Sequence, residues 1–168
     1  KRGSNGGAGI LVLPTGAGKT FTAVRFLAAG PLSEGYKVLW LAHTHHLLEQ
    51  AFHCFRPDRI GAIREPQREL RLRVVSGTPG HFAPRSIEPT DHVVIGTLQT
   101  ISNAIREDLA PMKAFLDAAG EKLFIVFDEA HHAPAPTYRK LIQSLQARSA
   151  LVLGLTATPV HTDESKQG

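Results

Sequence analysis

The sequence has little of what several classes of protein depend on. Its 168 residues include one cysteine, Cys54, which excludes an internal disulfide and a zinc site built from several cysteines, and favours a reducing, cytoplasmic location. The longest apolar runs, such as 10–13 and 123–127, are far too short to cross a bilayer, so no membrane contact is expected. The basic start lacks the apolar stretch of a signal peptide and an initiator methionine, which indicates a piece cut from a longer chain.

Neither sign of charge dominates. With 19 lysines and arginines against 15 acidic residues the net charge is +4, which is compatible with a polyanionic partner but identifies none. The length corresponds to a single domain, residues 1–168, and 42% hydrophobic residues are enough to form a core without metal or disulfide bonds.

Short apolar runs alternate with helical patterns along the chain. Strands are predicted at 10–13, 37–42, 72–75, 92–95, 123–127 and 150–153, and helices at 19–29, 44–55, 98–106, 112–119 and 136–146. Strands that are apolar on both faces and separated by helices predict an α/β fold, a mostly parallel sheet with helices on both faces. Ligands of such sheets bind beyond the carboxyl ends of the strands, so functional residues are expected there.

A phosphate-binding pattern follows the first predicted strand. Its residues are Pro14, Thr15, Gly16, Ala17, Gly18, Lys19 and Thr20. Gly16 and Gly18 let backbone N–H groups face a phosphate, and the following helix adds the positive end of its dipole. Lys19 can neutralise β- and γ-phosphate oxygens, and the Thr20 hydroxyl can bind Mg²⁺. The pattern predicts an ATP site with Mg²⁺, although Leu13 stands where glycine is usual; a chance glycine-rich turn is the alternative, and the flanking strand and helix disfavour it.

Two adjacent carboxylates follow the fifth predicted strand. Asp128 would hold Mg²⁺, through water, and Glu129 would orient and deprotonate an attacking water molecule. Alone, such a pair is more typical of a solvated loop. Together with the phosphate-binding pattern, it predicts hydrolysis of a nucleotide.

The sequence Asp128-Glu129-Ala130-His131 resembles the DEAH box of superfamily-two DEAD/DEAH helicases, and further motifs occur in that family's order. They include Thr44 and Thr97, which stand where the family contacts nucleic acid, and Thr156 and Thr158, which stand where it couples nucleotide state to domain movement. By this resemblance His131 links the ATP site to the coupling motif. The branch with restriction-enzyme motor subunits and excision-repair helicases is the most similar.

The resemblance implies a RecA-like P-loop NTPase domain. It further implies an ATP-binding motor domain that couples hydrolysis to movement on nucleic acid, with DNA favoured over RNA, and a second RecA-like domain in the same parent chain needed for turnover. Two alternatives stay open: the motor of a restriction enzyme that moves along duplex DNA without separating strands, and a nucleotide-binding scaffold that hydrolyses nothing. The scaffold is disfavoured because Lys19, Thr20, Asp128 and Glu129 are all present.

Three histidines surround Thr44, where many family members have Pro-Thr-Arg-Glu. Contact of His45 with a phosphate is therefore not expected, whereas Thr44 at a helix N-terminus remains a candidate. With His53, the histidines could suggest a metal, but a polar helix face is the favoured interpretation. Trp40 lies inside an apolar strand, which favours core packing over base stacking.

Overall fold

The computed structural model describes residues 8–12, 18–56, 70–129, 135–146, 148 and 150–156. Its strands are β1 (Ala8–Val12), β2 (Lys37–Ala42), β3 (Leu72–Val75), β4 (Val93–Thr97), β5 (Leu123–Asp128) and β6 (Leu151–Thr156). Its α-helices are α1 (Gly18–Ala29), α2 (His45–Phe55), α4 (Leu98–Arg106), α5 (Ala110–Ala119) and α6 (Ala135–Gln146), with short 3-10 helices η1 (Pro31–Glu34) and η2 (Pro84–Ser86). None of these helices is long and apolar enough to span a bilayer.

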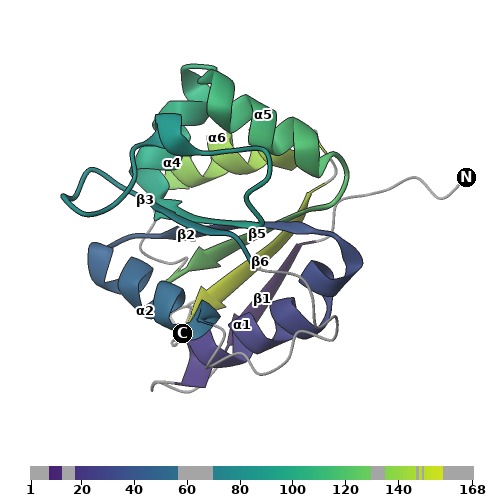
Figure 1. Ribbon diagram of the computed structural model, residues 1–168. Coiled ribbons are helices and arrows are strands. Elements are labelled where there is room, and N and C mark those ends of the chain that lie inside the picture. Colours follow the sequence, from purple (N-terminus) through teal and green to yellow (C-terminus); the bar gives the residue numbers. More distant parts are fainter. Residues whose placement is uncertain are drawn as a thin grey trace, which may run out of the picture.

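The six strands form one sheet in the order β1-β6-β5-β2-β4-β3, and every pair of neighbours is parallel. Helices α1 and α2 cover one face, and α4, α5 and α6 cover the other (Figure 1). The predicted α/β sheet with helices on both faces is confirmed.

Strand β5 shows why the central strands are apolar throughout. Ile125 and Phe127 enter the core beneath α4–α6, whereas Phe124 and Val126 enter the core beneath α1 and α2. Because side chains alternate between the faces of a strand, a strand covered on both sides needs an apolar residue at nearly every position.

Three strands extend beyond their predicted ends. Strand β5 includes Asp128, β4 runs to Thr97 and β6 runs to Thr156. The apolar runs are interrupted at Gly96 and Gly154, so the predictions ended there, but the parallel pairing continues through both glycines. These functional candidates are therefore held at the last positions of strands by the sheet itself.

Candidate nucleotide and nucleic-acid site

Two distant segments meet at the carboxyl edge of the sheet. Lys19 lies in the first turn of α1, and Asp128 and Glu129 lie at the end of β5. The Lys19 Nζ atom donates a hydrogen bond to Glu129 Oε1 and lies 3.7 Å from Asp128 Oδ1. Lys19 is 8% exposed, so its charge is balanced by carboxylates rather than by water. The structure thus brings together the ammonium and the two carboxylates that the motifs predict.

The Asp128 carboxylate has few stabilising contacts. Its side chain is buried, and within the described segments neither oxygen has a hydrogen-bond partner. Burial raises the pKa of Asp128 from 3.8 to about 6, and the nearby Lys19 charge opposes part of that rise. Two unpartnered carboxylate oxygens are a suitable donor set for Mg²⁺, which prefers hard oxygen ligands. Thr20, which follows Lys19 on α1 and is also buried, is the second predicted donor.

Glu129 has an unusual backbone conformation. Its φ angle of 52° lies in the left-handed region, which residues other than glycine adopt at an energetic cost. The strand therefore ends abruptly, and the Glu129 side chain turns toward Lys19. Such strain concentrates at functional positions, because the surrounding structure must hold the residue in place.

Gly18 begins α1, and a Cβ atom added to it would meet no atom of the described residues within 4 Å. The other predicted site residues lie outside the described residues: Pro14, Thr15, Gly16, Ala17, His131 and Thr158.

Thr44 and Thr97 lie at the ends of neighbouring strands. Ala42 of β2 pairs with Thr97 of β4, and each threonine caps the helix that follows. The Thr44 hydroxyl accepts a hydrogen bond from the N–H of Leu47 at 3.3 Å, as the predicted cap requires. The Thr97 hydroxyl accepts one from the N–H of Thr100 at 3.2 Å. Two helix N-termini thus open at one edge, an arrangement that favours phosphate groups.

A set of hydrogen bonds that no sequence pattern indicates connects α2 to the loop after β3. Ser76 Oγ lies 2.6 Å from His81 Nδ1, and His81 Nε2 lies 2.5 Å from Glu49 Oε1. Thr78 Oγ1 lies 2.9 Å from His45 Nδ1, so His45 packs against this loop. The described residues contain no group of three or more possible metal ligands among their histidine, cysteine and acidic side chains.

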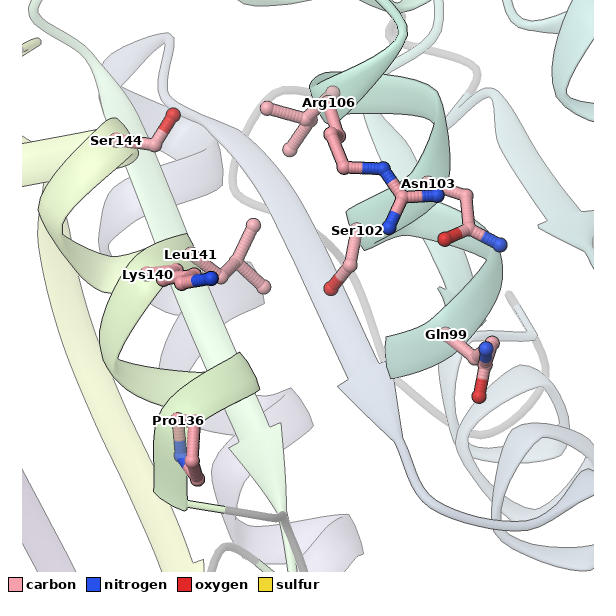
Figure 2. Close-up of a pocket in the computed structure, with 9 residues that line it drawn as sticks. Gln99, Ser102, Asn103, Arg106, Pro136, Lys140, Leu141 and Ser144 are labelled. Carbon is pink, nitrogen blue, oxygen red and sulfur yellow. The ribbon is translucent and has the colours of Figure 1, made fainter.

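A cavity of about 390 Å³ lies between α4 and α6 (Figure 2). Arg106 and Lys140 contribute positive charge to its wall, and the buried Ser102 hydroxyl has no hydrogen-bond partner in the part of the chain that the structure describes. None of the predicted site residues lines this cavity.

Comparison with known sequences gives a consistent result. A family described as "Type III restriction enzyme, res subunit" matches residues 1–161. The "DNA 3'-5' helicase XPB" of Mycobacterium tuberculosis is 32% identical over 162 residues, which cover 94% of this chain and 25% of that protein. The "ATP-dependent DNA helicase mph1" of Aspergillus fumigatus is 29% identical over 163 residues, 94% of this chain and 14% of that protein. The chain thus spans a quarter or less of these relatives.

Solved structures share the fold. The UvsW helicase from bacteriophage T4 aligns with a TM-score of 0.60 at 24% identity, covering 89% of this chain and 46% of that one. The Type ISP restriction-modification enzyme LlaGI, solved with a DNA substrate mimic, aligns with a TM-score of 0.62 at 22% identity, covering 95% and 17%. The fold is that of the RecA-like domains of helicases.

Proposed function

The chain belongs to the family of the type III restriction enzyme res subunit, and on that premise we propose that it is the ATP-binding motor domain of a DNA helicase or translocase. The observation that carries this proposal is the convergence of Lys19, Asp128 and Glu129 at the carboxyl edge of a parallel sheet. One cation and two carboxylates at a helix start provide a phosphate contact, a metal ligand and a base, which together suit hydrolysis of a phosphoanhydride.

The roles follow from the contacts. The α1 N-terminus and Lys19 bind the β- and γ-phosphates, so Lys19 exchanges its bond to Glu129 for one to phosphate. That exchange frees the Glu129 carboxylate to accept a proton from the attacking water. Asp128 and Thr20 would hold Mg²⁺, which would neutralise the negative charge that develops on the phosphates. His131 would then relay the change toward Thr156 and Thr158.

The nucleic-acid contacts are proposed at Thr44 and Thr97. Their helix N-termini lie at the ends of adjacent strands, where backbone N–H groups and hydroxyls can meet successive phosphates. DNA is favoured over RNA because the relatives named above are DNA helicases. A helicase and a restriction enzyme both share the fold, so the proposal covers strand separation as well as movement along intact duplex DNA.

Turnover is proposed to need a second RecA-like domain in the parent chain. Arg25 belongs to α1 and Arg139 to α6, so neither can close over the γ-phosphate from an opposing domain. An arginine supplied from another domain typically accelerates phosphoryl transfer by about 10³–10⁵. Residues 1–168 should therefore bind nucleotide weakly and hydrolyse it negligibly. The proposed location of the parent protein is the reducing cytoplasm.

Steady-state phosphate release tests this proposal. It would be measured for residues 1–168 and for a longer polypeptide that includes the following domain, each with and without single- and double-stranded DNA. Stimulated turnover in the longer form alone is the expected result. Turnover in neither form, with Mg·ATP binding intact, would favour the non-hydrolysing scaffold. Robust stimulation of the short form as a monomer would contradict the need for a second domain.

A further inference from the structure

Trp40 is fully buried in β2, yet it carries a polar group without a partner. Its ring packs edge-on against Phe55, with centroids 5.7 Å apart and planes at 87°. The indole N–H makes no hydrogen bond to any described residue. A buried donor without an acceptor is unfavourable, so its retention in a packed strand calls for an explanation.

The Asp128 carboxylate is a suitable acceptor for this N–H group. Strands β2 and β5 are neighbours, with Trp40 paired to Val126, and both side chains lie in the core beneath α1 and α2. Asp128 is two residues beyond Val126 and therefore points to the same face. Burial is the main influence on the pKa of Asp128 and raises it, and the Trp40 indole is among the groups that lower it. Among the described residues, an unpartnered buried donor and an unpartnered buried acceptor thus lie on the same face of neighbouring strands.

We propose that Trp40 is a positioning residue for the metal-binding carboxylate: its indole N–H donates to one Asp128 oxygen and leaves the other directed at Mg²⁺. This inference rests on the proposed ATP site. Donors behind a metal ligand fix the ligand's orientation, and their loss commonly weakens metal binding about 10- to 100-fold. An indole N–H is a donor only and is not titrated in the physiological range, so it can hold the carboxylate in one orientation.

The design of the test uses two substitutions that separate the N–H from the ring. Trp40→Phe keeps an aromatic ring against Phe55 but removes the donor. Phe55→Leu disturbs the same packing and keeps the donor, so it is the matched control. The readout is the Mg²⁺ concentration that half-saturates ADP binding, beside ADP affinity in EDTA, which reports the phosphate contacts without metal.

Trp40→Phe should raise the half-saturating Mg²⁺ concentration about tenfold and leave ADP affinity in EDTA unchanged, whereas Phe55→Leu should change neither. An unchanged Mg²⁺ requirement in Trp40→Phe overturns the proposal. An equal rise in both variants also overturns it, because packing alone would then account for the effect.

A second measurement needs no substitution at Trp40. The chain has a single tryptophan, so its emission reports this position alone. Adding Mg²⁺ to the ADP complex should change the emission, and Asp128→Asn should remove that change. If the emission does not change when Mg²⁺ is added, the proposal is overturned, even if Trp40→Phe does not fold. If calorimetry detects no Mg·ADP binding to the unsubstituted chain, the proposed ATP site itself is contradicted. If Trp40→Phe binds ADP with the normal dependence on Mg²⁺, only the proposed role of Trp40 is contradicted.

Discussion

The buried carboxylate of Asp128 should lower the free energy of unfolding of the chain. Its pKa is about 6 in the folded chain, against 3.8 ordinarily. Between these pH values the folded state retains a proton that the unfolded state has lost, so the free energy of unfolding falls as pH rises. Above pH 7 the loss is complete, and about two pKa units correspond to about 3 kcal/mol. Asp128→Asn removes the buried charge, but the new amide also needs hydrogen-bond partners, which offsets part of the effect. We therefore expect the free energy of unfolding to rise by about 2 kcal/mol.

Urea unfolding without Mg²⁺ or nucleotide measures this gain. At pH 7.5 Asp128→Asn should unfold at higher urea, with a melting temperature about 4–8 °C higher for a chain of this size. Near pH 4 most of the difference should vanish, because the folded wild-type carboxyl is then already neutral. A variant that is no more stable than the wild type at pH 7.5, or a gain that persists unchanged at pH 4, would refute the reasoning.

Asp91 provides a matched control, since it is equally buried but fully partnered. It is 1% exposed and accepts hydrogen bonds from Arg73 Nε at 2.7 Å, from Arg73 Nη2 at 3.2 Å and from the Glu88 N–H at 2.9 Å. Asp91→Asn weakens a buried ion pair and should destabilise the chain by about 2–4 kcal/mol. If Asp128→Asn raises the free energy of unfolding and Asp91→Asn lowers it, the partners of each carboxylate, rather than burial alone, decide the effect.

Three further predictions concern the nucleotide site and the sheet. Lys19→Ala should weaken Mg·ATP binding at least about tenfold by calorimetry while the circular dichroism spectrum is preserved, because the charge that meets the phosphates is lost. Glu129→Gln should bind ATP about fivefold more tightly, since Lys19 is released from an ion pair worth about 1 kcal/mol, yet release phosphate at least about 10² times more slowly in the longer polypeptide. Gly96→Ala should cost about 1–3 kcal/mol in urea unfolding, because its Cβ would lie 2.7 Å from Ile101 Cγ1; Gly77→Ala, where nothing lies within 4 Å, is the control and should change little.

Local patterns predicted most of the secondary structure. The bounds of β2, β3 and α4 are those that the sequence indicates, because a mostly apolar run marks each strand and a capping threonine marks the start of the helix. Helix α5 begins at Ala110 rather than at residue 112, since Pro111 is tolerated in a first helical turn and does not delay the start. The motif residues Lys19, Asp128 and Glu129 were placed together correctly because the strand–loop–helix pattern dictates where their segments end.

Contacts between distant segments could not be predicted from the sequence. The hydrogen bonds that join Ser76, His81 and Glu49 depend on how the loop after β3 folds back, which no local spacing encodes. Trp40 was correctly predicted to be buried, but its position on the same face as Asp128 follows from the pairing of β2 with β5. Strand order is a property of the whole sheet, so a one-dimensional pattern cannot specify it.

The strand order also sets a dimension of the proposed nucleotide site. Strand β6 lies between β1, which leads to the phosphate-binding segment, and β5, which ends in Asp128. The two halves of the site are therefore separated by two inter-strand distances, about 10 Å, whatever side chains the strands carry. Thr156 closes this spacer strand, level with Val12 on one side and one residue beyond the partner of Asp128 on the other. The separation of β1 from β5 can change only if the ladder on one side of β6 is strained, and Thr156 ends the strand that both ladders share.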